Sequence, residues 1–191
     1  MEVGRTLYAK NRKQWRSWLS KHHATAPDIW LIYYKKESGK PRIPYNDAVE
    51  EAICYGWIDS TLKPRDKKSW VQRFSPRRKN SPLSEMNKER VRRLMKAGKM
   101  TRFGFKRIQH HLDEKSPRSP KLKKFSLPND ILLLLKKDPL VWRNFMKFSA
   151  TYKRIRVGWI DGARHRPEIF NQRLRYFMSM TAQNKKFGMV Q

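Results

Sequence analysis

The sequence has few acidic residues, one cysteine and no long apolar run. Asp and Glu account for 16 of its 191 residues against 45 Lys and Arg, which gives a net charge of +29. The lone Cys54 excludes an internal disulfide framework, and its apolar neighbours predict a small buried side chain. The longest aliphatic run, residues 131–135, is far shorter than the roughly 20 residues of a membrane span. Because residues 1–15 also contain no apolar signal segment, we expect a cytoplasmic location and no membrane span.

Motifs for cofactor and metal chemistry are also missing. Gly98 and Gly104 are isolated glycines, so no glycine-rich phosphate loop is predicted. The His pairs at 22–23 and 110–111 consist of adjacent residues, which on a helix point about 100° apart and make poor joint ligands. We therefore expect neither a metal nor a cofactor, and the sequence gives no positive argument for an enzyme.

The apolar residues that are present predict a folded α+β protein. A hydrophobic share of 38%, with 7 Trp, 9 Phe and 7 Tyr, is sufficient for a core. Periodicity predicts a strand over 29–34, a hairpin with strands 60–63 and 69–75 around the loop 64–68, and helices over 10–22, 46–56 and 84–96. In the second helix, apolar spacing places Glu50 and Glu51 on the solvent side.

The C-terminal part is predicted to be helical. Helices are expected to begin near Pro128, Pro139 and Pro167, since proline is tolerated in a first helical turn, and another covers about 151–163. The predicted fold class is α+β: a small antiparallel sheet with a basic hairpin packed by helices, followed by a helical C-terminal part. The predicted domains are an α+β domain at 1–107, a linker at 108–127 and a helical subdomain at 128–191.

The positive charge is concentrated in particular segments. Residues 28–60 hold 4 basic and 6 acidic residues, whereas residues 61–107 hold 17 basic and 3 acidic, a net charge of +14. A protruding basic ribbon can follow the phosphates of a nucleic acid, so we predict phosphate contacts there and on the C-terminal helices. The predicted nucleic-acid-binding residues are Lys63, Arg65, Lys67, Lys68, Arg73, Arg77, Arg78, Lys79, Lys88, Arg92, Lys99, Arg164, Arg166 and Arg173. Trp70 and Phe74 could stack on unpaired bases, although strand alternation favours a core position for both.

The tetrapeptide Gly-Trp-Ile-Asp occurs twice, at 56–59 and at 158–161. The flanking residues do not repeat, which argues against a duplicated module and favours Trp57 and Trp159 as anchors of two core regions. Asp59 and Asp161 remain candidates for a carboxylate pair with acid–base chemistry. The alternative is that each one caps an element or pairs with an arginine.

An ordered set of motifs resembles a known family. The stretch 48–60, which contains Gly56, Trp57 and Asp59, is followed by similar segments at 73–78, 84–87 and 96–100, and then by 159–174 with Trp159 and Asp161. This order, covering 15–185, is similar to the YdeI/OmpD-associated, or bacteriocin-protection, family. Leu83 stands where that family usually has Trp, and residues 169–170 replace its usual Thr-Arg. The resemblance implies bacteriocin or antimicrobial-peptide tolerance and no settled biochemical activity.

Two functions follow from the sequence. The leading hypothesis is a non-catalytic protein that binds nucleic acid, DNA or RNA, through phosphate contacts that are largely independent of sequence. The alternative is a tolerance or stress protein of the YdeI/OmpD-associated family that acts through protein contacts, its basic surface reflecting only general composition. The oligomeric state is left open.

Overall fold

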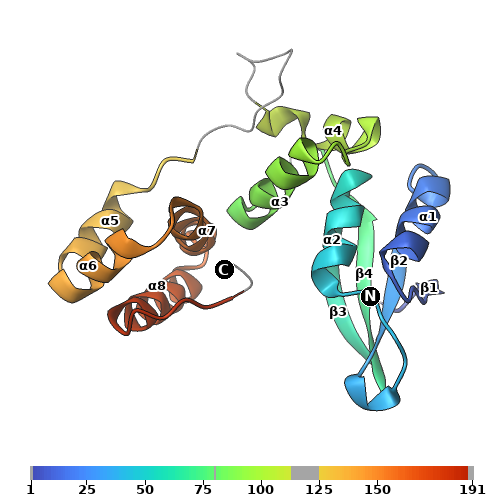
Figure 1. Cartoon of the computed structure of the whole chain (residues 1–191), viewed down its shortest axis with the longest axis horizontal. Coiled ribbons are helices and arrows are strands. Elements are labelled where there is room, and N and C mark those ends of the chain that lie inside the picture. The colour runs from blue at the N-terminus through green and yellow to red at the C-terminus, as the bar shows by residue number, and fades with distance from the viewer. Residues whose placement is uncertain (1, 80, 113–124, 189–191) are drawn as a thin grey trace. The chain divides into compact units, whose positions relative to one another are not determined.

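The computed structural model describes residues 2–79, 81–112 and 125–188 (Figure 1). The chain divides into a unit of Met1–Pro82 with Arg90–Lys121 and a second unit of Leu83–Glu89 with Leu122–Gln191. We call these the N-terminal and C-terminal units. The predicted fold class is confirmed, because strands and helices occupy the N-terminal unit and the C-terminal part is helical. The predicted linker lies mostly outside the described residues and stays a prediction.

A mixed sheet forms the centre of the N-terminal unit. Its strands are β1 (Thr6–Leu7), β2 (Ile29–Tyr34), β3 (Trp57–Asp66) and β4 (Ser69–Pro76), in the order β1-β2-β4-β3. The pairs β2–β4 and β3–β4 are antiparallel, as predicted, whereas β1 adds a parallel edge strand that the sequence analysis did not identify.

Strand β3 is longer than predicted. The expected loop at 64–68 is reduced to the two residues between Asp66 and Ser69, because β3 continues through Pro64, which pairs with Trp70. Pro64 is tolerated because β3 is an edge strand, where a missing N–H need not interrupt a ladder. The register shifts between Pro64 and Asp66, so the strand is irregular at the point where the sequence pattern breaks.

Two helices cover one face of this sheet. They are α1 (Arg12–His22) and α2 (Tyr45–Cys54), and a short 3₁₀ turn, η1 (Lys36–Ser38), precedes α2 (Figure 1). Trp15 of α1 is fully buried and packs its ring 5.3 Å from that of Phe74, which is therefore a core residue. The opposite face buries a separate apolar cluster of Trp30, Ile32 and Val71.

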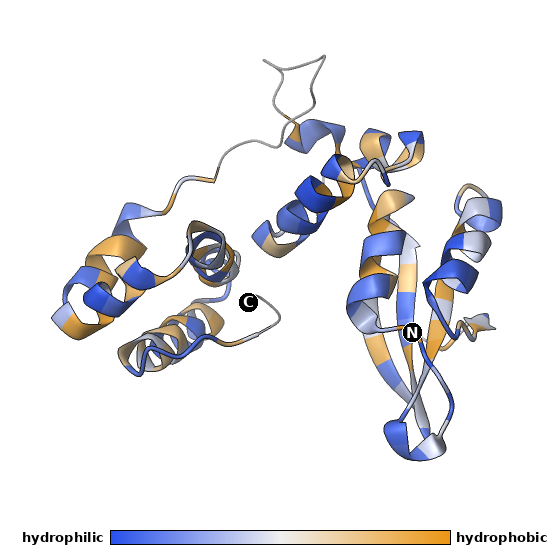
Figure 2. Ribbon diagram, viewed as in Figure 1, coloured by the Kyte–Doolittle hydropathy of each residue, from blue (hydrophilic) through white to orange (hydrophobic). Residues whose placement is uncertain are grey.

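Helix α3 (Glu85–Lys96) begins and ends where the sequence predicts. The Ser84 hydroxyl accepts a hydrogen bond from Asn87 N at 3.2 Å, and Gly98 adopts a φ of +64° after the last turn. Val91 is buried, while most of the helix is hydrophilic (Figure 2). Helix α4 (Arg102–Ile108) and the 3₁₀ turn η2 (Gln109–His111) follow.

The C-terminal helices also begin close to their predicted starts. They are α5 (Asn129–Lys136), α6 (Pro139–Lys147), α7 (Ala150–Asp161) and α8 (Pro167–Ala182). Asp138 and Ser149 cap α6 and α7 by accepting backbone N–H groups. Among the described residues, no helix has both the length and the apolar character needed to cross a bilayer.

The C-terminal unit has its own core. Ile131, Phe145, Tyr152 and Phe177 are all almost completely buried and come from α5, α6, α7 and α8 respectively. Asn144 is buried as well, and its side-chain amide donates to two carbonyl oxygens at the end of α8, at 3.0 and 3.1 Å. Most buried polar atoms in proteins are paired, and this contact joins α6 to the end of α8.

The prediction that Glu51 faces solvent is wrong. Its side chain is 2% exposed, and its two carboxylate oxygens accept from Arg12 Nε at 2.7 Å and from Arg16 Nη1 at 2.6 Å. Arg12 and Arg16 are four residues apart on α1 and so lie on one face of that helix, where they bracket the carboxylate. Pairing with two cations allows the charge to be buried, which an apolar periodicity alone cannot predict.

We expect Glu51→Ala to lower the free energy of unfolding by about 2 kcal/mol, because it removes two charge-assisted hydrogen bonds between α1 and α2. Arg12 and Arg16 are 33% and 37% exposed and can be rehydrated, which keeps the loss below that of a fully buried pair. Urea denaturation followed by circular dichroism measures the change. Glu37→Ala, at an exposed position of η1, is the control and should change the value by less than about 0.5 kcal/mol. Equal effects of the two substitutions would contradict the assigned role of Glu51.

Candidate functional site

Helix α4 approaches the end of α2 closely enough to build one side of a pocket. Thr101 donates to the carbonyl oxygen of Cys54 from its backbone N–H at 3.1 Å and from its hydroxyl at 2.6 Å. The same hydroxyl caps α4 by accepting from Gly104 N at 3.2 Å. A Cβ on Gly104 would lie 2.4 Å from the Cys54 oxygen, so this approach requires glycine. Cys54 is buried as predicted, and burial raises the pKa of its thiol to about 11.

Gly56 is the second residue that permits this approach. It ends α2 with a φ of +73°, a conformation that favours glycine, and a Cβ there would lie 2.5 Å from Cγ of Arg107. Its carbonyl oxygen accepts from Arg77 N at 2.9 Å. Gly56 therefore turns the chain from α2 into β3 and leaves room for an α4 side chain beside Tyr55 and Trp57.

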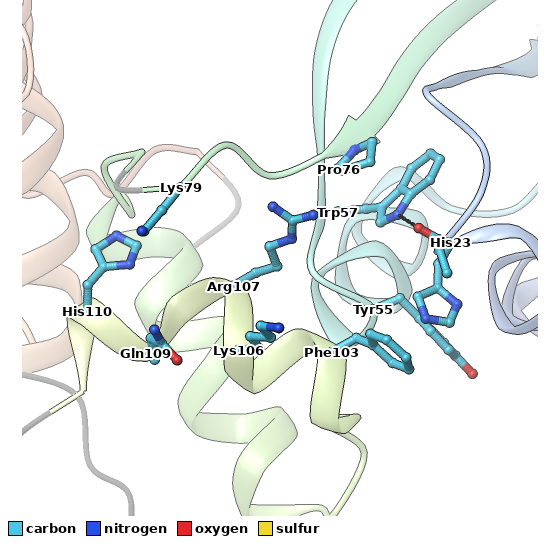
Figure 3. A pocket seen from close by; sticks show the side chains of 11 residues that line it. His23, Tyr55, Trp57, Pro76, Lys79, Phe103, Lys106, Arg107, Gln109 and His110 are labelled. Atoms are coloured by element: carbon cyan, nitrogen blue, oxygen red, sulfur yellow. Dashed lines mark hydrogen bonds between the residues drawn. The ribbon is translucent and has the colours of Figure 1, made fainter.

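The resulting pocket has a volume of about 560 Å³ and one aromatic wall (Figure 3). The His23 ring lies 4.2 Å from the ring of Phe103, in an edge-to-face arrangement, and 5.1 Å from that of Tyr55. Trp57 is 1% exposed and donates from its indole N–H to the His23 carbonyl oxygen at 3.0 Å, which fixes the His23 backbone at the wall. Phe103 is 51% exposed, so its ring is accessible to a ligand.

The rest of the lining is basic. Lys79, Lys106, Arg107 and His110 line the pocket, and no Asp or Glu is among the described residues that do so. Arg107 donates from Nη1 to the Arg77 carbonyl oxygen at 3.2 Å, which leaves other guanidinium N–H groups available. In the view of Figure 3, Lys79 and His110 lie on one side of Arg107 and the aromatic rings lie on the other. The pocket is therefore suited to a ligand that is both anionic and aromatic.

The basic hairpin turn is a second cationic feature of the N-terminal unit. Asp66 holds the turn by accepting Lys68 N and the Ser69 hydroxyl, each at 2.8 Å. These contacts lower the pKa of the Asp66 carboxyl, the Ser69 hydrogen bond most of all. Lys67 and Lys68 are exposed at the turn, as the sequence predicts for a hairpin tip. Arg65 Nη1 forms an ion pair with Asp66 Oδ2 at 3.6 Å.

Two predicted contact residues in β4 and its exit are held within the N-terminal unit. Arg73 donates from Nε at 2.9 Å and from Nη2 at 2.7 Å to one carboxylate oxygen of Asp28. Arg77 is only 4% exposed and donates to the Pro82 carbonyl oxygen. Burial lowers the pKa of the Arg77 guanidinium, with Asp59 acting in the opposite direction. Both arginines therefore stabilise the fold.

Three predicted residues are held in the same way within the C-terminal unit. Lys88 donates to the buried Glu85 at 2.6 Å, and Arg173 donates to the Trp159 carbonyl oxygen at 2.6 Å while lying over the indole ring. Arg164 donates to both oxygens of Asp130 at 2.9 Å and also to Asp161. The pKa of the Asp130 carboxyl is lowered, chiefly by its hydrogen bonds with Arg164.

The remaining predicted residues differ in exposure and pairing. Lys63 and Arg92 have interaction partners. Exposed residues without an ion pair to any described acidic side chain are Lys67, Lys68, Arg78, Lys79, Lys99 and Arg166. Only Lys79 of these also lines the pocket.

The two motif aspartates have different local partners. Asp59 lies in β3 and accepts from the Tyr45 hydroxyl at 2.6 Å, while Asp161 ends α7 and pairs with Arg164. Burial, together with the Asp59 contact, raises the pKa of the Tyr45 hydroxyl. Asp161 thus has the arginine partner that the non-catalytic interpretation predicts, whereas Asp59 is bound by a tyrosine hydroxyl, which that interpretation did not name.

Sequence reasoning missed most of the pocket, including Phe103, Lys106 and Arg107, and it considered His23 and His110 only as metal ligands. The spacing of Phe103, Lys106 and Arg107 at i, i+3 and i+4 was an available signal, because such residues share one face of a helix. Within the described residues, no group of His, Cys, Asp and Glu is arranged to hold a metal ion.

We expect Gly104→Ala to lower the free energy of unfolding by about 1–3 kcal/mol, since its Cβ would have to push α4 away from the Cys54 carbonyl. Gly4→Ala is a matched control, because a Cβ there would meet its nearest heavy atom at 3.7 Å, an ordinary contact. Urea denaturation compares the two variants. A Gly104→Ala protein as stable as Gly4→Ala would show that α4 does not depend on this approach.

Comparison with known proteins identifies two matched regions. A family model described as a domain of unknown function (DUF8412) matches residues 7–107, and the model described as bacteriocin-protection, YdeI or OmpD-associated matches residues 124–184. No curated protein and no solved structure matches the chain. The resemblance to the YdeI/OmpD-associated family is confirmed over 124–184, which includes the second Gly-Trp-Ile-Asp motif; the first motif lies in the other matched region. Because the model for residues 7–107 covers more than half of the sequence, the chain belongs to the DUF8412 family and carries a YdeI/OmpD-associated region at its C-terminal end.

Proposed function

We propose that this protein binds nucleic acid in the cytoplasm through phosphate contacts that are largely independent of base sequence. The observation that carries the proposal is the excess of exposed cations. The net charge is +29, and residues 61–107 alone contribute +14 from 17 basic and 3 acidic residues. A polyphosphate chain is the ligand class that such a surface attracts most strongly, because neutralising its phosphates releases condensed counterions.

The hairpin turn is the first contact that we assign. Lys67 and Lys68 are exposed, and neither forms an ion pair with a described acidic residue. Asp66 holds the backbone of the turn, so the two lysines project from a fixed ribbon and only their side chains need to be ordered on binding. A phosphate backbone can approach a protruding ribbon without a matching groove, which supports contact independent of sequence.

The intramolecular ion pairs are the basis on which we choose the cations that we assign to binding. Arg73, Lys88 and Arg164 already donate to carboxylates, so a phosphate would have to displace those contacts. We assign binding to the exposed cations outside such pairs and expect little from the paired ones. This separates the proposal from a general effect of basic composition, in which every cation would contribute alike.

A fluorescence-anisotropy titration with labelled duplex and single-stranded oligonucleotides at several salt concentrations tests the proposal. We expect the affinity to fall steeply with salt on a logarithmic plot. Replacing Lys67 and Lys68 together with Ala removes two phosphate contacts and should reduce the slope on duplex DNA by about 1.8, since each contact contributes about 0.9. The loss should be similar for unrelated sequences.

Lys88→Ala is the control, because its ammonium is bound by Glu85. It removes one positive charge but should leave the slope unchanged. The absence of binding near 100 mM salt would overturn the proposal, as would a slope independent of salt. If Lys88→Ala changes the salt slope as much per charge as the hairpin substitutions do, the observed binding reflects net charge alone and not the hairpin contacts.

The match over residues 124–184 favours a second candidate, protection against bacteriocins through protein contacts of the C-terminal unit. Expression of the full chain in a bacteriocin-sensitive bacterium should then raise survival. The variant with Lys67 and Lys68 replaced by Ala should protect equally well, because the hairpin lies outside the matched residues. Unchanged survival with the full chain would exclude this candidate, and protection that requires the hairpin lysines would favour the first.

A further inference from the structure

We propose that the pocket between α4 and the start of β3 binds one nucleotide unit, meaning an aromatic ring joined to a phosphate group. The inference deepens the proposed function within the same N-terminal unit but stands on separate observations. The pocket is lined by Trp57 and Pro76, which pair at one end of the hairpin, whereas the exposed lysines lie at the turn between Asp66 and Ser69. The seven-residue rise of β4 places these two features roughly 23 Å apart.

The aromatic wall supplies a stacking surface. Phe103 keeps 51% of its area exposed, although it belongs to a helix that is fixed on its other side by the Gly104 and Thr101 contacts. The His23 ring holds the Phe103 side chain from its edge, at 4.2 Å. A large ring held in place but exposed is a platform for a planar ligand, because stacking then costs little conformational entropy.

The basic lining determines the charge of the ligand. Lys79, Lys106 and Arg107 line the pocket, and no described carboxylate is among the lining residues. A cationic ligand would find no counter-charge there, and a neutral one would leave these donors without new partners. A phosphate offers several acceptor oxygens to lysine and arginine donors and is the anion they bind most readily.

The size of the pocket agrees with such a ligand. Its volume of about 560 Å³ lies within the range of about 300–1,000 Å³ that is typical of small-molecule and cofactor sites. The base would stack at Phe103 and Tyr55 while the phosphate lies toward Lys79 and Arg107, following the separation of rings and cations in Figure 3. Paired bases within a duplex are stacked on both faces, so only a free nucleotide or an unpaired nucleotide of a strand can enter.

Isothermal titration calorimetry of the full chain with adenosine 5′-monophosphate, adenosine and inorganic phosphate tests the chemistry. Binding of the monophosphate should exceed that of adenosine or phosphate at least tenfold, because only the monophosphate engages both walls. Parallel titrations with a short single strand and with a duplex of the same sequence distinguish a free nucleotide from a nucleotide within a polymer.

Phe103→Ala should weaken monophosphate or single-strand binding by about 5- to 140-fold, the range expected for loss of one base–aromatic stack. Leu62→Ala is the matched control, since Leu62 is a similarly exposed apolar residue, at 58%, that does not line the pocket. Lys106→Ala should weaken phosphate-dependent binding, whereas Lys96→Ala, exposed near the end of α3 and outside the pocket, should not. Because Phe103 and Lys106 are exposed, both variants should keep the wild-type circular dichroism spectrum.

The outcomes separate this inference from the proposed function. Loss of monophosphate binding in Phe103→Ala supports the pocket even if the hairpin lysines prove irrelevant to nucleic acid. If Phe103→Ala weakens binding of the single strand alone, the pocket is supported, and its ligand is a nucleotide within a polymer. Phe103→Ala that binds every probe like Leu62→Ala overturns the inference, while leaving a hairpin-dependent affinity for duplex intact. Absence of binding to both the monophosphate and the single strand overturns it as well.

Discussion

The contact of α4 with the carbonyl oxygen of Cys54 is the constraint on which the pocket depends. One oxygen at the end of α2 accepts both Thr101 donors, and the Thr101 hydroxyl in turn caps α4. Gly104 and Gly56 are needed because a side chain on either would overlap an atom that makes this packing. The exposed ring of Phe103 and the cations of α4 are thus positioned by small residues that contact no ligand, and the chemistry of the site follows from a backbone contact.

Local signals predicted most of the elements and failed where distant partners decide the outcome. The strand β2 and the helices α1 and α8 have strong periodicity or an N-terminal proline, and all three form as expected. The two-residue β1 has no such signal, because it exists only through its pairing with β2. Glu51 shows the same limit: its burial depends on arginines of another helix, and no pattern within its own helix indicates them.

The sequence predicted the positive charge of the candidate site but not which residues form it. Counting identifies 61–107 as the most basic stretch, yet it cannot separate Lys67, which is exposed, from Arg73, which is bound to Asp28. The pocket draws its residues from four separate segments, within 23–24, 55–57, 76–79 and 103–110. Only folding brings these segments together, so the sequence identified Lys79 alone among the lining residues as a ligand contact, while it assigned Trp57 to a core and considered His23 and His110 only as metal ligands.

The repeated tetrapeptide is explained by packing in two different backbone states. Gly56 follows the last turn of α2 with a φ of +73°, and a Cβ on it would lie 2.5 Å from Cγ of Arg107. Gly158 lies within α7, and a Cβ on it would lie 2.6 Å from Cγ of Glu85. What the copies share is therefore a glycine that another side chain crowds, beside a tryptophan that takes part in a backbone hydrogen bond. The Trp57 indole N–H donates to the His23 carbonyl oxygen, and the Trp159 carbonyl oxygen accepts from the Arg173 guanidinium. Only the first copy adjoins the pocket. The same four residues therefore have different roles: the first copy positions a candidate ligand site, and the second packs a helix of the C-terminal unit.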